Sequence, residues 1–185
     1  QKDYDKAAQN YIHALNLYTN EEENGNEAER AKLCSQIGDA CMDSKKFNRA
    51  LPYYSRGLKL NKSLKGEQHA ETATAYSKIG LGYEKQEEYP KALENYLKAL
   101  EIRKAVHENN HEETAASYES IGKVYDKQTN LGEAIDYYSQ AFNILKSLRG
   151  ANDSKVKALS TAIFDLRCRE NKNNPQVQPP ILNKP

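Results

Sequence analysis

A set of aromatic and small residues recurs every 42 residues along this chain, and this period constrains the fold more than any single residue does. One unit carries Tyr76, Ile79, Gly80, Tyr83, Tyr89, Ala92, Tyr96 and Ala99. The next unit carries Tyr118, Ile121, Gly122, Tyr125, Leu131, Ala134, Tyr138 and Ala141. The preceding unit carries Cys34, Ile37, Gly38, Cys41, Phe47, Ala50, Tyr54 and Gly57. A fixed period of this size is typical of similar structural units stacked into an array.

Each unit contains two segments with helical spacing. Tyr76, Ile79 and Tyr83 lie three or four residues apart on one face, and the apolar residues of 93–102 follow the same rule. Residues 86–88 form a short turn between these segments, and Pro90 falls in the first turn of the second, where its missing N–H costs nothing. The sequence therefore predicts an all-α fold built from antiparallel helix pairs, an α-solenoid.

The 42-residue register also divides the chain. We expect an array over residues 1–170 and a Pro- and Asn-rich extended tail over 171–185. Within the array we expect a partial repeat at 3–19, full repeats at 27–65, 69–108 and 111–150, and a capping helix at 153–169. Gly66 and Gly150 are expected to cap second helices with left-handed backbone, and Asn109-Asn110 to do the same in the middle repeat.

The first predicted helix is a second helix without its first. Tyr4, Ala7, Tyr11 and Ala14 match the second-helix residues of the full repeats, which leaves an apolar stripe with no partner. We therefore expect the missing first helix, and further repeats, to lie upstream in the full protein.

Composition narrows the classes of function. The net charge of +1 argues against a nucleic-acid or anionic-membrane partner, and no apolar run approaches the ~18 residues that span a bilayer. Hydrophobic residues make up 38% of the chain, which suits an elongated array better than a large globular core. The three cysteines include no CxxC pair, and Cys34 and Cys41 occupy positions that tyrosine holds elsewhere. They are interpreted as buried thiols in a reducing, cytoplasmic compartment.

Candidate chemical sites each have a simpler interpretation. His107 and His111 have zinc-ligand spacing, but they end one predicted helix and begin the next, so helix-terminal surface histidines are favoured. Cys168 has no activating base, and Glu21-Glu22-Glu23 lacks the alternating ligands of a calcium loop. The tyrosine pairs at 53–54 and 137–138 resemble stacking platforms for nucleic acid, but their second members are core positions. We expect no metal, no cofactor and no enzymatic activity.

The repeat pattern resembles a known family. Numbered from Ala73 as position 1, the recurring residues fall at positions 4, 7, 8, 11, 20, 24 and 27. This is similar to the tetratricopeptide repeat (TPR), and the match covers residues 3–169. The 42-residue period and the stretch 69–103 resemble the kinesin light chain and nephrocystin type. The resemblance implies a right-handed superhelix. We expect Gly80 to face Ala92 at the helix crossing, and Tyr83, Tyr89 and Tyr96 to fill the space between repeats.

The resemblance also implies a function and a surface. In this family the first helices line a concave face that binds partner proteins or peptides. The residues expected there are Lys32, Asp39, Ser77, Lys78, Leu81, Lys85, Glu119, Lys123 and Lys127. The lysines would pair with acidic groups of a partner, unless neighbouring Glu and Asp residues neutralise them locally. Charge reversal at Lys78 and Lys123 is then expected to weaken binding with little change in melting temperature.

Two wider roles fit this reading. The first is a scaffold or adaptor segment of a larger cytoskeletal, motor or ciliary assembly. The alternative is a regulatory sensor array attached to a catalytic domain elsewhere in a longer protein.

Overall fold

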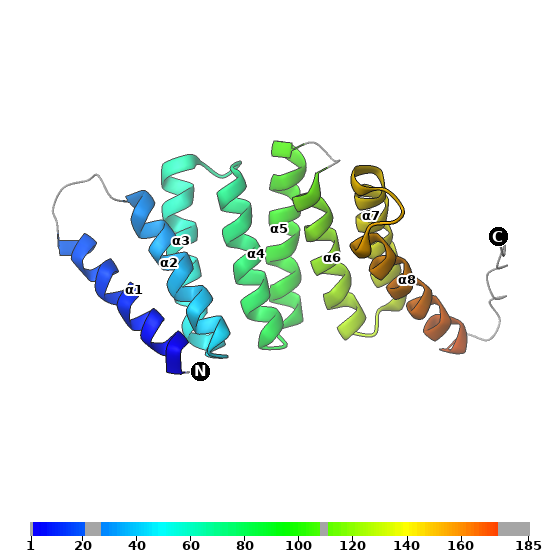
Figure 1. Ribbon diagram of the computed structural model, residues 1–185, viewed down its shortest axis with the longest axis horizontal. Coiled ribbons are helices and arrows are strands. Elements are labelled where there is room, and N and C mark those ends of the chain that lie inside the picture. Colours follow the sequence, from blue (N-terminus) through cyan, green and yellow to red (C-terminus); the bar gives the residue numbers. More distant parts are fainter. Residues whose placement is uncertain (1, 21–26, 108–110, 174–185) are drawn as a thin grey trace. The chain divides into compact units, whose positions relative to one another are not determined.

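The computed structural model describes residues 2–20, 27–107 and 111–173, and every regular element in these ranges is an α-helix (Figure 1). The chain forms two compact units, Gln1–Glu108 and Asn109–Pro185. The first unit contains α1 (Lys2–Asn20), α2 (Glu27–Asp43), α3 (Phe47–Lys65), α4 (Ala70–Lys85) and α5 (Tyr89–His107). The second contains α6 (Glu112–Lys127), α7 (Leu131–Arg149) and α8 (Ser154–Asn173).

Helices in each unit pack on their neighbours in chain order. In the first unit α1 packs on α2, α2 on α3, α3 on α4 and α4 on α5; in the second, α6 packs on α7 and α7 on α8. The core is therefore a chain of interhelical layers. The layer around α2 and α3 includes Ile37, Cys34 and Ala50, all fully buried, and the layer in the second unit includes Ala134 and Leu166.

Each helix crossing brings a tyrosine ring against a repeat glycine. The atoms nearest to a Cβ placed on Gly80 belong to the ring of Tyr96, the closest of them at 2.8 Å. The same pairing occurs in the other repeats, between Gly38 and Tyr54 and between Gly122 and Tyr138. Tyr96, which was predicted to fill the space between repeats, thus packs against the first helix of its own repeat. The glycine is needed because a tyrosine ring occupies the space of its side chain.

Tyr96 also makes a buried polar contact across this crossing. Its hydroxyl donates a hydrogen bond of 2.9 Å to Oε2 of Glu84, which is 7% exposed. Burial, the Glu84 charge and this hydrogen bond together raise the pKa of Tyr96, so it stays a neutral donor. By contrast, Tyr83 is half-buried and packs against the cluster formed by α1, α2 and α3, which agrees with the predicted position between repeats.

Each turn between paired helices has one residue in the left-handed region. Lys45, Glu87 and Thr129 have φ of 58°, 61° and 60° and are spaced 42 residues apart. In the last turn the Thr129 N–H donates to Asp126 O at 2.9 Å and the Asn130 N–H to Tyr125 O at 2.9 Å. This is the Schellman pattern, whose left-handed position usually holds glycine. Thr129 is β-branched, so it fits this backbone poorly.

We therefore expect Thr129→Gly to stabilise the protein. Relief of the left-handed backbone is worth about 1–2 kcal/mol, and the greater freedom of glycine in the unfolded chain offsets about half of it. The net gain is about 0.5–1 kcal/mol, measured as the midpoint of urea unfolding at unchanged slope. Thr161→Gly, within the exposed face of α8, is the matched control and should destabilise by about 0.3 kcal/mol. A loss of stability in Thr129→Gly would contradict this account of the turn.

First helices begin at capping residues that also repeat every 42 residues. Nδ1 of His69 accepts the Glu71 N–H at 3.2 Å, and Nδ1 of His111 accepts the Glu113 N–H at 3.2 Å. Asp153 holds the same place before α8, where its Oδ1 accepts the Lys155 N–H at 2.9 Å. These contacts satisfy backbone donors that the first helical turn leaves open. His69 and His111 are therefore helix caps. His107 is the last residue of α5, so His107 and His111 both lie at helix ends, as the sequence predicted.

Glycines end α3 and α7, as the sequence predicted, but their ψ angles differ from those of the left-handed helical region. Gly66 and Gly150 have φ of 91° and 83°, as predicted, but ψ of 171° and 164°, in a region that is essentially restricted to glycine. The predicted Asn109-Asn110 cap lies outside the described residues. The helix α8 continues through residues 171–173, where an extended tail was predicted, and ends at Asn173, two residues before Pro175. The rest of the predicted tail, 174–185, lies outside the described residues.

Candidate functional site

The residues predicted to line the first-helix face of the first unit differ in their surroundings. Lys32 is exposed and its Nζ lies 3.5 Å from Glu29 Oε1, an exposed pair one turn apart. Leu81 is 37% exposed, and Lys85 is exposed. Ser77 accepts a 3.0 Å hydrogen bond from Nη1 of Arg103, so it faces α5 rather than solvent alone.

Lys78 and Asp39 are brought together into one polar network. Nζ of Lys78 donates to both carboxylate oxygens of Asp39, at 2.9 and 2.6 Å, and to Oγ of Ser35 at 2.6 Å. The Tyr54 hydroxyl donates to Asp39 Oδ1 at 2.8 Å, and Lys78 Nζ lies 5.8 Å from the Tyr54 ring centroid. Burial and the contact with Asp39 raise the pKa of Tyr54. This network joins α2, α3 and α4, so Lys78 holds two repeats together.

In the second unit, Glu119 and Lys123 form an ion pair of 2.6 Å one turn apart on α6, with Lys123 half exposed. Lys127 is exposed at the end of the same helix. Asp126 accepts a 2.7 Å contact from Arg169 of α8. These pairs agree with the interpretation of a first-helix surface whose charges are largely neutralised locally.

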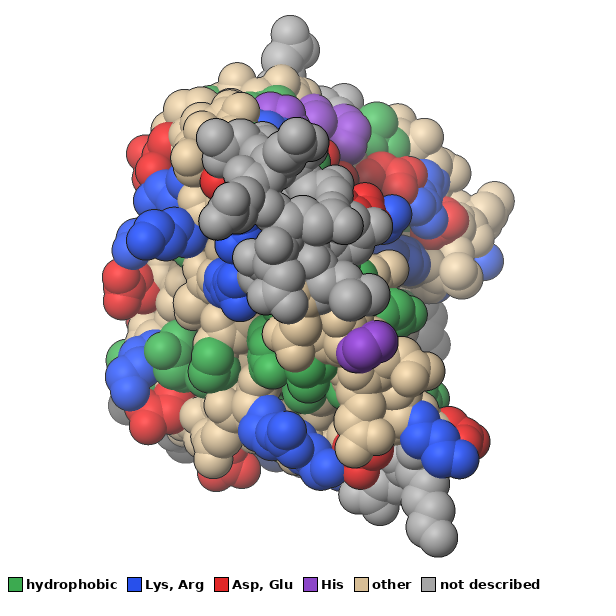
Figure 2. All heavy atoms as spheres, turned by 90° about the vertical axis from the view of Figure 1, so that its left-hand side faces the viewer, with side chains coloured by type: hydrophobic (Ala, Val, Ile, Leu, Met, Phe, Trp, Pro, Cys, Tyr) green, Lys and Arg blue, Asp and Glu red, His purple; other side chains and the backbone are tan. Residues whose placement is uncertain are grey.

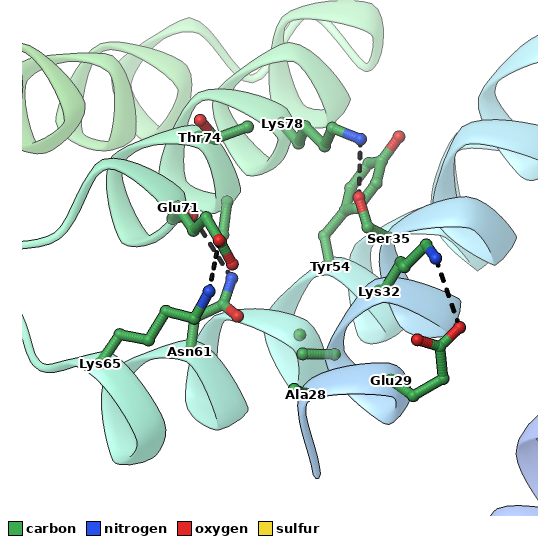
Figure 3. Close-up of a pocket in the computed structure, with 13 residues that line it drawn as sticks. Ala28, Glu29, Lys32, Ser35, Tyr54, Asn61, Lys65, Glu71, Thr74 and Lys78 are labelled. Atoms are coloured by element: carbon green, nitrogen blue, oxygen red, sulfur yellow. Dashed lines mark hydrogen bonds and ion pairs between the residues drawn. The ribbon is translucent and has the colours of Figure 1, made fainter. Parts of the chain in front are cut away.

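A pocket of about 430 Å³ opens between α2 and α4 in the first unit, with α3 below them (Figure 3). Its lining residues are Ala28, Glu29, Ala31, Lys32 and Ser35 of α2; Tyr54, Gly57, Asn61 and Lys65 of α3; and Glu71, Thr74, Ala75 and Lys78 of α4. This volume lies in the range of ligand sites, which are commonly apolar with a few polar groups at the edge.

The charged groups at the edge of the pocket are paired. Lys65 contacts the Glu71 carboxylate, whose backbone carbonyl accepts a 3.4 Å hydrogen bond from Asn61 Nδ2 (Figure 3). Lys32 pairs with Glu29 and Lys78 pairs with Asp39. Together with the Lys65–Glu71 pair, three lysines are paired with three carboxylates. The pocket therefore offers little net charge, and its apolar wall is what remains to select a ligand.

The sequence pointed to this region only in part. Lys32 and Lys78 were predicted on this face, but the pocket was not, because a cavity depends on which side chains are small across three helices. One signal was present: Gly57 takes the position that Ala99 and Ala141 hold in the other repeats. A Cβ on Gly57 would lie 3.4 Å from the Ala31 carbonyl oxygen, an ordinary contact, so the glycine is not required by packing.

Two of the three cysteines are core residues. Cys34 and Cys41 are buried, and burial raises the pKa of both thiols, as expected of inert core residues. Cys168 is exposed. Across 2–20, 27–107 and 111–173, no group of three or more His, Cys, Asp or Glu side chains is arranged to hold a metal ion. The Glu21–Glu23 segment lies outside the described residues.

Of the two tyrosine pairs weighed as stacking platforms, the 137–138 pair contributes Tyr137 to a packed cluster in the second unit. The ring of Tyr137 stacks on Tyr125, with centroids 5.4 Å apart and an interplanar angle of 18°, and lies 6.1 Å from the Tyr118 centroid. Tyr118 and Tyr125 pack against the core of that unit. In the described ranges, no helix is long and apolar enough to span a bilayer.

The repeat family is confirmed by comparison with known proteins. The sequence matches the Tetratricopeptide repeat family over residues 29–105 and 71–147, which together cover more than half of the chain. The chain therefore belongs to the tetratricopeptide repeat family, whose arrays serve as protein-interaction scaffolds. The match is to a repeat and not to a catalytic family. A search of the curated proteins found no match.

Solved structures show the same fold. BtubC (BKLC) from P. vanneervenii is 18% identical with a TM-score of 0.73, over 99% of this chain and 81% of that one. TPR-like repeats of a Podosopora anserina protein described as a kinesin light chain are 10% identical with a TM-score of 0.77, over 93% and 81%. The N-terminal domain of stress-induced protein-1 from C. elegans is 16% identical with a TM-score of 0.59, over 78% and 98%. The predicted all-α solenoid, similar to kinesin light chain repeats, is thus confirmed at the level of fold.

Proposed function

We propose that this chain is an adaptor segment that binds a partner protein along its first-helix face, with an apolar side chain of the partner anchored in the pocket between α2 and α4. The observation that carries the proposal is this pocket, because it combines an open apolar wall with a rim of polar groups. A buried anchor residue commonly supplies much of the binding energy at such interfaces.

The lysine–carboxylate pairs at the rim of the pocket determine which chemical class of partner fits there. Each lysine at the rim already faces a carboxylate, so a partner gains little by bringing more negative charge. The partner segment is therefore selected by an apolar residue that fits between Ala31 and Ala75, with polar backbone contacts at the rim. This differs from the acidic partner that the lysines suggested in the sequence, and it implies binding that depends weakly on salt.

The test fills the pocket without disturbing the core. Ala75 is half-buried at the pocket wall, so Ala75→Leu should occupy the anchor site while the helix keeps its stability. We expect peptides selected from an array by the unmodified protein to share an apolar residue and to lose at least about tenfold in affinity for Ala75→Leu. Fluorescence anisotropy measures this, with circular dichroism confirming the fold.

Ala158→Leu on the exposed face of α8 is the matched control, because it makes the same chemical change away from the pocket. It should leave affinity unchanged. Peptides that bind Ala75→Leu as tightly as the unmodified protein would show that the pocket is not the binding site.

The wider setting proposed for this binding is a larger cytoplasmic assembly of cytoskeletal, motor or ciliary type. The fold similarity to BtubC and to the kinesin light chain repeats supports it. A regulatory array attached to a catalytic domain elsewhere in a longer protein is the second candidate. Affinity purification of the full-length protein separates the two, since co-purified structural proteins support the adaptor and a catalytic domain in the same polypeptide supports the sensor.

A further inference from the structure

The first unit contains a second pocket, of about 300 Å³, where the turn 44–46 leads into α3 beside the end of α4. Figure 1 shows that the turns 44–46 and 86–88 lie at the same edge of this unit. We call it the basic pocket, and its lining residues are Lys45, Lys46, Phe47, Asn48, Arg49 and Gln86. Three of these residues are cations, and none of the six lines the pocket between α2 and α4.

Two of the three cations at the basic pocket are unpaired. Figure 2 views the end of the structure where α1 lies, and it shows Lys and Arg side chains along the lower edge, with acidic side chains among them. Nζ of Lys46 donates a 2.6 Å hydrogen bond to Oδ1 of Asp5, and this bond lowers the pKa of Asp5. The side chains of Lys45 and Arg49 form no ion pair or hydrogen bond with any residue that the structure describes. The basic pocket therefore keeps two uncompensated positive charges.

The turn geometry does not require cations at these positions. The left-handed position of the three turns has nearly the same φ in each repeat but holds a different residue, namely Lys45, Glu87 or Thr129. A cation is disfavoured at the start of a helix, because the open N–H groups give that end a partial positive charge. The first turns of α2, α4, α6 and α7 carry acidic residues, whereas that of α3 carries Arg49 and no acidic residue. These cations repel one another and the start of α3 unless an anion lies between them.

A neutral donor at the basic pocket also lacks an acceptor. Nε2 of Gln86 is buried and has no hydrogen-bond partner in the described part of the chain. A buried donor without a partner costs stability. At the start of α3, the N-cap residue Lys46 makes no side-chain cap, so the first backbone N–H groups of this helix are further donors at the same edge. An oxyanion in the pocket supplies acceptors for these donors as well as negative charge for the cations.

We propose that the basic pocket binds a phosphate monoester carried by a side chain of a partner protein. Such a group has about two negative charges at pH 7 and three acceptor oxygens, which match two unpaired cations and an amide donor. The planar guanidinium of Arg49 can hold two phosphate oxygens at once, and Lys45 supplies the second charge. Recognition of phosphorylated motifs by basic clusters is a recurrent mode of peptide binding. This contact is independent of the apolar anchor proposed above.

Other anions match the basic pocket less well. A carboxylate carries one charge, so it would leave Lys45 or Arg49 uncompensated. Anionic membranes are bound by clusters of roughly four to eight Lys and Arg residues, more than the two that are unpaired here. Nucleic acid is held by cations that follow several phosphates, whereas this pocket gathers its cations at one point. The charges therefore favour a single phosphate group.

The first test detects phosphate binding through the stability of the full chain. Inorganic phosphate is compared with chloride at equal ionic strength, in the unmodified protein and in the double variant Lys45→Glu, Arg49→Glu. We expect phosphate to raise the melting temperature by about 3 °C more in the unmodified protein, because only that protein binds it in the basic pocket. Both substitutions introduce the residue that another repeat holds at the same place, Glu87 or Glu133, so the variant should fold.

The matched control is Lys157→Glu with Arg167→Glu, which makes the same charge change on the exposed face of α8. It should respond to phosphate as the unmodified protein does. Ala75→Leu, which fills the pocket between α2 and α4, should also keep the full response, so failure of the apolar anchor and failure of this site are distinguishable. An equal rise in the unmodified protein and in the Lys45→Glu, Arg49→Glu variant would overturn the proposal.

A second test identifies what carries the phosphate. We expect phosphopeptides selected from a degenerate library to bind at least about tenfold more tightly than their unphosphorylated forms, measured by fluorescence anisotropy. The Lys45→Glu, Arg49→Glu variant should lose this difference, and the α8 control should keep it. Equal affinity for the two forms would overturn the proposal. Phosphatidylcholine vesicles that contain a phosphoinositide test the other source, and binding to them in place of phosphopeptides, abolished by the same variant, would make a lipid headgroup the ligand and overturn it as well.

Discussion

Replacing Gly38 with alanine should destabilise the protein by about 2–3 kcal/mol, although alanine is the better helix former. The added Cβ would lie 2.2 Å from Cε1 and 2.5 Å from Cδ1 of Tyr54, far inside contact distance. The ring cannot turn away easily, because Tyr54 is 3% exposed and its hydroxyl is held by Asp39. Separation of α2 from α3 is then the remaining way to relieve the clash.

The measurement is the free energy of unfolding in urea, with a fall in melting temperature of roughly 5–10 °C as a second readout. Gly57→Ala is the matched control on the facing helix. Its Cβ would meet ordinary contacts of 3.4 Å or more, so the gain in helix propensity should stabilise by about 0.5–1 kcal/mol. Opposite signs for the same substitution are the expected result.

The distances at the three helix crossings also predict the order of the stability losses that alanine causes at the three glycines. The closest approach of an added Cβ to the tyrosine ring is 2.2 Å at Gly38, 2.8 Å at Gly80 and 3.0 Å at Gly122. The cost of alanine should therefore fall from Gly38 to Gly80 to Gly122. A Gly38→Ala variant as stable as the unmodified protein would show that these glycines are not required by the tyrosine rings.

These crossings also show how far the sequence predicts the fold. The period and the helical spacing were enough to place the helix pairs, because residues that share a helix face recur at three and four positions. The identity of the residue opposite Gly80 was not predictable in this way. Spacing says which residues share a face, but it does not say that the ring of Tyr96 lies against Gly80 across the crossing.

The same limit applies to predicting the candidate site from the sequence. Lys78 and Lys123 were equivalent in the sequence, since both lie on the predicted first-helix face. Their surroundings differ because the partner of Lys78 is Asp39 on another helix, 39 residues away, whereas the partner of Lys123 is Glu119, one turn away. Helical spacing predicts contacts within one helix, such as Lys123–Glu119, but it does not predict contacts between helices, such as Lys78–Asp39. The substitution of Gly57 for alanine was the one sequence feature that marked the pocket.

Charge reversal at Lys78 should therefore lower stability as well as any binding, by about 2 kcal/mol. The Lys78→Glu side chain would lose hydrogen bonds to Ser35 and to both oxygens of Asp39, and would place a second carboxylate beside the first. The Lys78 side chain is 28% exposed and that of Asp39 47%, so solvent screens part of the repulsion and the cost stays below that of a fully buried pair. Urea unfolding measures this loss.

Lys123→Glu is the matched control on α6. Lys123 is 52% exposed and its ion pair with Glu119 lies on the helix surface, so the reversal should cost about 0.5 kcal/mol or less. Because Lys78→Glu loosens the contact between α2 and α4 that shapes the pocket, weaker peptide binding in that variant does not by itself show that Lys78 touches the partner. Equal stability losses at the two positions would contradict the structural role of Lys78. Weaker binding by Lys123→Glu at unchanged stability would instead support the predicted first-helix face that binds a partner through its charges.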